Sequence, residues 1–331
     1  MTTLIARARK HILAALTVLF TAAGLSMTAA AQTWPNQPIT VIVPWPAGGP
    51  SDIAARPLSK GLSEAFGQPV VVNNHAGAGG NIGTAFVARS KPDGNTLLIT
   101  ASGPIVINKY LYKEMPFDPK RDLQPVTNLL RVSQVLVVHP SVPAHNLKEL
   151  IAYIQSQNGK FNWASAGLGT TQHMTGELFK SQAKLQMNHI PYKGSAPAIT
   201  DVVGGQVPML IDSTIAVVPM IKSGKVRAIA VSGKTRSPNL PDVPTFEEAG
   251  MPGFESYAWY GLFAPAKVPA DIIAKLNQAA RKYMQSAEFK QVLEETGSDY
   301  VGTDPATFGQ FIDEEAARWE RLAPTLNLSI E

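Results

Sequence analysis

Cysteine is absent from the 331-residue chain, and this excludes several kinds of chemistry together. Disulfides, thiolate metal sites and a cysteine nucleophile are all impossible. The sequence also lacks an HExxH zinc motif, a DxDxDG calcium loop and a GxSxG nucleophile elbow. None of the histidines after position 31 pairs with another at metal-ligand spacing on one helix. We therefore predict no metal site and no cofactor.

Charged residues make up only 16% of the chain, and the net charge of +4 comes mostly from its N-terminus. Three basic residues between positions 7 and 10 precede an apolar run at 12–25, which is too short to span a bilayer. Small residues follow at 29–31, so the pattern predicts a signal peptide cleaved after Ala31. A short membrane anchor is the alternative.

Without this leader, 26 basic and 25 acidic residues remain, and the excess of basic residues typical of nucleic-acid-binding proteins is gone. We expect export to a bacterial periplasm as a soluble monomer, with no nucleic acid as partner.

The rest of the chain repeats one plan: a short apolar run, a loop rich in Gly or Pro, then an amphipathic helix. Strands that are apolar on both faces and alternate with helices predict parallel sheets in an α/β protein. Strand-like runs at 132–138 and 257–264 flank a central α/β block. We predict two α/β domains joined by these two crossing strands. Lobe 1 would span 32–131 plus 265–331, and lobe 2 would span 132–264 with the hinge strands included.

Three glycine-containing loops, at 46–52, 76–83 and 165–171, each connect a predicted strand to a predicted helix. Unpaired N–H groups and the dipole at a helix N-terminus favour an anion, and glycine permits close approach. Any single glycine more often serves a tight turn, but three such loops at strand ends would face a shared crevice. A dinucleotide is disfavoured because the spacing at 77–83 is GxGGxxG. No Arg or Lys lies in these loops, which favours a carboxylate over a phosphate.

Several motifs together resemble the Bug-type receptors, the substrate-binding proteins of tripartite tricarboxylate transporters. The matching runs are PWPAGGPSD at 44–52, NHAGAGGNIG at 74–83, SAGLGTTQH at 165–173, HIPYKGSAPA at 189–198 and GGQV at 204–207, with Asp212. The resemblance implies a two-lobed periplasmic-binding-protein type II fold that closes on a carboxylate. It also implies membrane permease subunits as partners. Two departures lie near the expected cleft: Trp45, where phenylalanine is frequent, and His75-Ala76, where a basic residue and proline are more usual.

The ligand-binding residues that we expect are carried over from these matches. Backbone amides would come from the glycine loops, hydroxyls from Ser165 and Thr170, and a loop-ordering carboxylate from Asp52, which we expect to cap its helix. A lone helical histidine such as His173 is more often structural than a ligand contact, and Tyr192 and Asp212 are as easily framework residues as site residues. The full set is Trp45, Ala47, Gly48, Gly49, Asp52, Gly79, Gly80, Asn81, Ser165, Gly167, Thr170, His173, Tyr192 and Asp212.

The predicted function is therefore a periplasmic receptor that captures a small organic acid and delivers it to the transporter. Dicarboxylates and aromatic carboxylates are favoured as ligands. Two alternatives remain open: an exported hydrolase that uses Ser165 and His173, and a sensor that presents its ligand to a signalling partner. No acidic residue completes a Ser–His–acid triad by pattern, which favours a binding protein over an enzyme.

Overall fold

The computed structural model describes residues 34–326, so the predicted signal peptide lies outside the described residues. The first sheet has the strand order β2-β1-β3-β9-β4. Its members are β1 (Ile39–Val43), β2 (Val70–Asn74), β3 (Thr96–Ala101), β9 (Tyr257–Pro265) and the first part of β4 (Leu123–Val138), with the two-residue β10 (Asp299–Tyr300) paired beside β4. The strands β1, β2 and β3 pair in parallel, as the βα pattern predicts, whereas β9 runs antiparallel to both neighbours.

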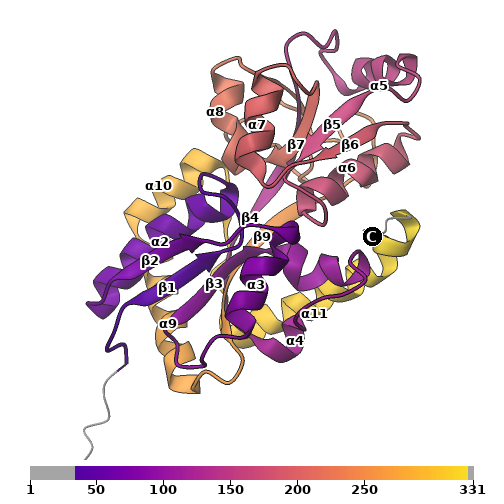
Figure 1. Cartoon of the computed structure of the whole chain (residues 1–331). Coiled ribbons are helices and arrows are strands. Elements are labelled where there is room, and N and C mark those ends of the chain that lie inside the picture. The colour runs from indigo at the N-terminus through magenta and orange to yellow at the C-terminus, as the bar shows by residue number, and fades with distance from the viewer. Residues whose placement is uncertain (1–33, 327–331) are drawn as a thin grey trace, which may run out of the picture. The chain divides into compact units, whose positions relative to one another are not determined.

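The second sheet is built around the last part of β4. Gln134–Val138 pairs antiparallel with β7 (Met209–Ser213), and Val135–Val138 also pairs with β8 (Arg227–Val231). Beyond β7 lie β5 (Asn162–Ser165) and β6 (Asn188–Pro191), which are parallel to one another. Figure 1 shows the two sheets one above the other, with β4 between them.

Helices cover both sheets (Figure 1). Those around the first sheet, lobe 1, are α2 (Pro50–Phe66), α3 (Asn81–Ala88), α4 (Pro119–Asp122), α9 (Ala270–Met284), α10 (Ala287–Thr296) and α11 (Pro305–Leu322). Those around the second sheet, lobe 2, are α5 (Leu147–Ser156), α6 (Thr171–Gln182), α7 (Ser195–Val203) and α8 (Thr214–Lys222). Among residues 34–326, no helix is long and apolar enough to cross a membrane.

The alternation of side chains along β4 explains why lobe 2 has three layers. Leu136 and Val138 pack into one hydrophobic cluster, with Trp163 and Phe179, while Val135 and Val137 pack into another on the opposite face. Successive residues of a strand point to opposite faces, so an apolar run of this kind requires helices on both sides. A third cluster fills lobe 1, and Met174 of α6 joins it.

The strand β4 starts nine residues earlier than the predicted run at 132–138. Its first half contains polar residues and Pro125, so the sequence there lacks the pattern of a strand. In the structure, the register of this half with β9 shifts twice. Backbone groups in this stretch bond to other parts of lobe 1; Asn277 Nδ2, for example, donates to Val126 O at 2.8 Å.

The chain passes from lobe 1 to lobe 2 within β4. Ser133 pairs with Tyr257 of β9, whereas Gln134 pairs with Ser213 of β7. Since all of β9 pairs inside the first sheet, we propose that the lobe boundary lies at 133/134 and between β8 and β9. This boundary differs from the predicted lobe 2, which includes 257–264, and the two can be compared by domain-motion measurements.

Candidate functional site

A cavity of about 20 Å³ lies between the two lobes, at the carboxyl ends of the parallel strands and at the helix N-termini that follow them. This volume holds about one water molecule. The two lobes are therefore in close contact where they line the cavity, and a larger molecule enters only if the lobes separate. The lining residues are Trp45, Gly49, Pro50, Ser51, Ala101, Gly103 and Tyr260 from lobe 1, and Ala166, Thr170, Thr171, Gln172, Gly194 and Ser195 from lobe 2.

The loop before α2 is ordered by Asp52, which is almost fully buried. Its carboxylate accepts hydrogen bonds from Gly48 N at 3.0 Å, from Asn74 Nδ2 at 3.0 Å and from two nitrogens of Arg56 at 2.8 and 2.9 Å. Burial alone would raise the pKa of Asp52, but these bonds and the Arg56 charge outweigh it and lower the pKa below the ordinary value. The role expected for Asp52 in ordering the loop matches these contacts. The expectation that Asp52 caps the helix is wrong: α2 begins at Pro50, its N-cap is Gly49, and no side chain caps it.

Of the other residues predicted in this loop, Trp45 and Gly49 line the cavity. Ala47 and Gly48 are exposed, and the Gly48 amide is already bonded to Asp52. The direct role predicted for these two amides in ligand binding stays a prediction.

The second glycine loop lies at the seam between the lobes and does not line the cavity described above. A Cβ on Gly79 would lie 2.5 Å from Leu168 O of lobe 2, and one on Gly80 would lie 2.8 Å from Trp45 Cζ2. Asn108 holds this loop, because its amide donates to Gly79 O at 3.1 Å and to Asn81 Oδ1 at 2.7 Å. The loop therefore supports Trp45 and the closed contact between the lobes.

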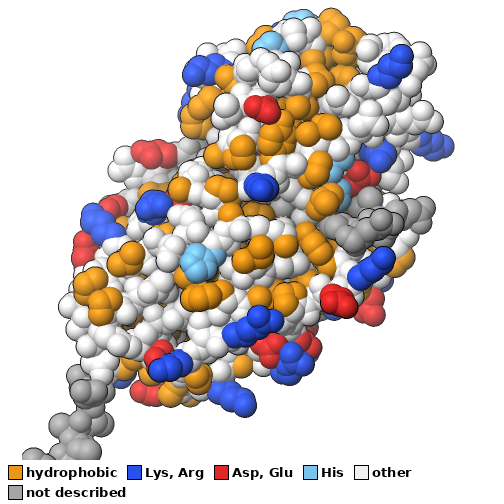
Figure 2. Space-filling model, in the orientation of Figure 1, with side chains coloured by type: hydrophobic (Ala, Val, Ile, Leu, Met, Phe, Trp, Pro, Cys, Tyr) orange, Lys and Arg blue, Asp and Glu red, His pale blue; other side chains and the backbone are white. Residues whose placement is uncertain are grey.

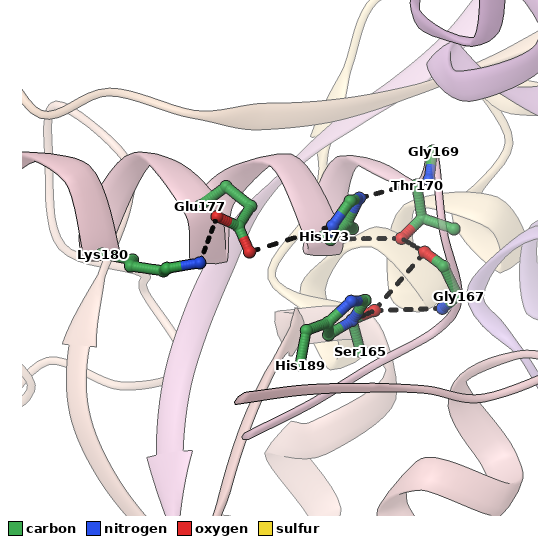
Figure 3. A network of polar contacts seen from close by, with 8 residues as sticks. All are labelled: Ser165, Gly167, Gly169, Thr170, His173, Glu177, Lys180 and His189. Carbon is green, nitrogen blue, oxygen red and sulfur yellow. Dashed lines mark hydrogen bonds and ion pairs between the residues drawn. The ribbon is translucent and has the colours of Figure 1, made fainter. Parts of the chain in front are cut away.

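In lobe 2, the loop at 165–171 is held by the polar network in Figure 3. Ser165 Oγ lies 2.6 Å from His189 Nε2 and accepts from Gly167 N at 3.1 Å. Thr170 caps α6: its hydroxyl accepts from His173 N at 3.1 Å and donates to Gly167 O at 2.7 Å. Ser165 and Thr170 thus use their hydroxyls inside the loop, although Thr170 also lines the cavity.

His173 lies behind this loop. Its Nδ1 accepts from Gly169 N at 3.3 Å, and its Nε2 lies 4.0 Å from Glu177 Oε1 (Figure 3). Burial, with a small contribution from the Lys180 charge, lowers the pKa of His173 to about 4. Since Nδ1 accepts, the neutral ring carries its proton on Nε2, toward Glu177.

His189 stacks against both Trp163 and His173, with its ring centroid 4.3 Å from each of theirs. Burial, followed by the neighbouring His173 and Lys180, lowers the pKa of His189 to about 3. The hydrolase alternative required Ser165 to pair with His173, and that pair does not form. Ser165 is fully buried and contacts His189 instead.

Asp212 lies beneath the lobe 2 face and is fully buried. Its Oδ1 accepts from Gln172 Nε2 at 2.9 Å, Ser195 Oγ at 2.9 Å and Ser213 N at 2.7 Å. Burial outweighs these bonds and raises the pKa of Asp212 to about 6. Tyr192 points elsewhere, since its hydroxyl donates to Asp201 Oδ2 at 2.6 Å.

The two faces also touch directly. Ser102 Oγ of lobe 1 lies 2.6 Å from Thr171 Oγ1 of lobe 2. A Cβ on Gly103 would lie 2.7 Å from Gly169 O, and one on Gly194 would lie 2.7 Å from Pro46 Cδ. Close approach of the lobes therefore requires glycine at these positions. In the view of Figure 2, hydrophobic side chains gather near the junction, and most charged side chains lie toward the outer parts.

The prediction missed several lining residues, including Ser51, Gly103, Gln172, Ser195 and Tyr260. Two signals were available. The run Ala101-Ser102-Gly103-Pro104 follows a strand as the other loops do, and Gly194-Ser195 begins a helix after β6. Asn108 and Tyr260 carried no local signal, because their positions depend on the packing of distant strands.

The lining residues that the structure describes are all uncharged. The first turns of α2, α6 and α7 each bring at least one residue to the cavity. The first N–H groups of a helix lack partners within it, and the dipole is positive there. The arrangement is suited to binding an anion through neutral donors. Within the described residues, no group of three His, Asp or Glu side chains is placed to hold a metal ion.

The family described as "Tripartite tricarboxylate transporter family receptor" matches residues 54–328. The chain belongs to this family. Protein BugT of Bordetella pertussis is 38% identical over 310 residues, which are 93% of this chain and 95% of that protein. The predicted resemblance to Bug-type receptors is therefore confirmed.

Two solved structures are similar to this chain over most of its length. One, an R. palustris protein with adipate, has a TM-score of 0.87 and 34% identity, covering 90% of this chain and all of that one. The other, MatC from Rhodopseudomonas palustris with bound malate, has a TM-score of 0.84 and 33% identity, covering 88% of this chain and all of that one. These likenesses confirm the two-lobed α/β fold. The family consists of periplasmic solute-binding receptors.

Proposed function

We propose that this receptor captures a small organic carboxylate between its lobes and delivers it to membrane permease subunits of a tripartite tricarboxylate-type transporter. The observation that carries the proposal is the cavity itself. It lies between two faces that contact one another, it is lined by uncharged groups, and helix N-termini open onto it. Neighbours that hold adipate and malate support a dicarboxylate. Trp45 at the cavity wall keeps aromatic carboxylates among the candidates.

The same proposal includes a periplasmic monomer whose signal peptide is removed after Ala31. N-terminal sequencing of the secreted protein would then begin at Gln32.

A thermal-shift screen tests the ligand class. A ligand that binds only the folded protein stabilises it by about 2.7 kcal/mol at a hundredfold excess over Kd. For domains of this size each kcal/mol raises Tm by roughly 2–4 °C, so a true ligand is expected to raise it by several degrees. Dicarboxylates and aromatic carboxylates should raise Tm, and their methyl esters should not. If a sugar or a metal ion gives the largest rise in Tm and no carboxylate raises Tm, the proposal is wrong.

A second experiment tests closure. In Gly103→Ala the added Cβ meets Gly169 O only when the lobes are closed, so we expect binding of the best carboxylate to weaken at least tenfold. Small-angle scattering should show that this ligand lowers the radius of gyration of the wild-type protein more than that of the variant. Gly309→Ala is the matched control, because the nearest atom to its Cβ is 3.8 Å away. If Gly103→Ala binds and contracts like the wild type, the closure model is wrong.

A further inference from the structure

The lobe 2 face of the cavity contains two side chains that depend on one buried carboxylate. Gln172 and Ser195 both line the cavity, and both donate to Oδ1 of Asp212 at 2.9 Å. They come from the first turns of different helices, α6 and α7, and Asp212 from the end of β7. One buried group therefore fixes both.

A carboxylate oxygen can only accept a hydrogen bond here, and this decides how its two neighbours are oriented. Gln172 must turn its Nε2 toward Asp212, which leaves its amide oxygen for the cavity. Ser195 has a single hydroxyl proton, and this proton is directed to Asp212, so only the lone pairs of Oγ remain. All three donors meet Oδ1, while Oδ2 has no partner among residues 34–326. The orientation therefore holds whether or not Oδ2 carries a proton.

The surroundings of this spot offer donors rather than acceptors. The backbone N–H groups that begin α6 and α7 lack helical partners, and they are suited to the oxygens of a ligand carboxylate. The two acceptors beside these N–H groups, the Gln172 amide oxygen and the Ser195 hydroxyl oxygen, require that the ligand also carry a hydrogen-bond donor close to its carboxylate. A hydroxyl meets this requirement. An ammonium group would also donate, but it would lie near the positive ends of two helix dipoles.

We propose that Asp212 acts as a positioning residue that turns Gln172 and Ser195 into a hydrogen-bond-accepting spot, so that the site selects hydroxycarboxylates over unsubstituted carboxylates. This inference rests on the proposed function, because it concerns the ligand of the same cavity. A buried acceptor left unpaired weakens binding, and the single proton of a ligand hydroxyl can pair one acceptor that an unsubstituted ligand leaves without a donor.

The test compares four-carbon dicarboxylates by isothermal titration calorimetry at pH 7.5. L-Malate has the hydroxyl, succinate lacks it, 2-methylsuccinate replaces it with a methyl group of similar size, and L-aspartate replaces it with an ammonium. We expect malate to bind at least tenfold more tightly than each of the other three. Equal affinities for malate and succinate would overturn the inference, as would tightest binding by aspartate.

Variants then show whether Asp212 sets this preference. In Asp212→Asn the amide can donate to Gln172, which frees Gln172 to turn its own Nε2 toward the cavity. The malate-to-succinate ratio should fall at least fivefold in this variant and in Gln172→Met. Gln182→Met, at the exposed end of the same helix, is the matched control and should keep the wild-type ratio.

The ratio separates positioning from stability, because a general loss of folding weakens both ligands alike. If Asp212→Asn retains the wild-type ratio, Asp212 does not position these side chains. If no carboxylate of any class binds, the proposed function itself has failed. If carboxylates bind without preference, only this inference has failed.

Discussion

Each lobe has a buried aspartate behind its face of the cleft, and the two differ in what balances them. Asp52 of lobe 1 accepts from the guanidinium of Arg56, and its pKa is lowered. Asp212 of lobe 2 accepts only from neutral donors, and burial raises its pKa to about 6. Both make several hydrogen bonds, so the number of bonds does not decide the direction. Two differences do: Arg56 donates to Asp52 and adds its charge, whereas Asp212 is more deeply buried and pairs with no cation among residues 34–326.

The difference matches what each carboxylate does. Asp52 is held by Arg56 at the surface and fixes the backbone of a loop through Gly48 N. No cation among residues 34–326 pairs with Asp212, and its carboxylate contacts the polar side chains that face the cavity. Lobe 1 therefore lines the cavity with an ordered loop and two aromatic side chains, Trp45 and Tyr260. Lobe 2 lines it with side chains whose hydrogen atoms point to the buried Asp212.

The largest expected effect concerns Asp212 and the pH dependence of stability. Its folded-state pKa lies above the ordinary value of 3.8, so the folded protein binds more protons than the unfolded chain between these values. The free energy of unfolding should therefore fall as pH rises through about 4 to 6. A shift of roughly two pKa units corresponds to about 3 kcal/mol. Asp212→Asn removes this titration.

Urea denaturation of both proteins at several pH values measures the contribution of Asp212. The stability of Asp212→Asn relative to the wild type should rise by about 3 kcal/mol between pH 4 and pH 7. A difference that does not change with pH would show that Asp212 titrates normally in the folded protein.

Asp52→Asn should give a smaller effect of opposite sign. The pKa of Asp52 is lowered in the folded protein, so its contribution is present above pH 4 and is lost as pH falls below the ordinary value of 3.8. We expect a loss of about 1–2 kcal/mol at pH 7, because Arg56 is half exposed and water screens the pair. The same denaturation series should show the loss shrink as pH falls below 3.8. A loss that grows at low pH would contradict this assignment.

The sequence predicted the βα units well because each has a local signature. The glycine loops at 46–52 and 165–171 connect a strand to a helix as predicted, β1 to α2 and β5 to α6, and Asp52 lies four residues from the amide that it fixes. The arrangement of the lobe 2 face could not be predicted in this way. The contact of Ser165 with His189 spans 24 residues and that of Gln172 with Asp212 spans 40, so each depends on strand order. No local pattern encodes such a pairing.

The same limit applies to the second glycine loop. Its composition predicts anion binding, but its position is set by Asn108, which brings it to the seam between the lobes. Glycine there permits the approach of Leu168 O from lobe 2. A glycine loop is thus equally suited to a ligand and to another stretch of backbone, and only the packing distinguishes the two.

The smallest expected effect compares the helix starts on the two faces. On lobe 1, the N-cap of α2 is Gly49, so no side chain caps the helix, whereas on lobe 2 the Thr170 hydroxyl caps α6 and also donates to Gly167 O. Thr170→Ala should lower the free energy of unfolding by about 1 kcal/mol, as is typical for the loss of an N-cap. Thr170→Ser, which keeps the hydroxyl, should recover most of this loss. The sequence had instead suggested that Thr170 binds the ligand, and denaturation and titration of the same variants separate the two roles. If the hydroxyl acts only as a cap, Thr170→Ala lowers the stability of the ligand-free protein and leaves carboxylate binding unchanged. If the hydroxyl contacts the ligand instead, Thr170→Ala weakens carboxylate binding and leaves the stability of the ligand-free protein unchanged.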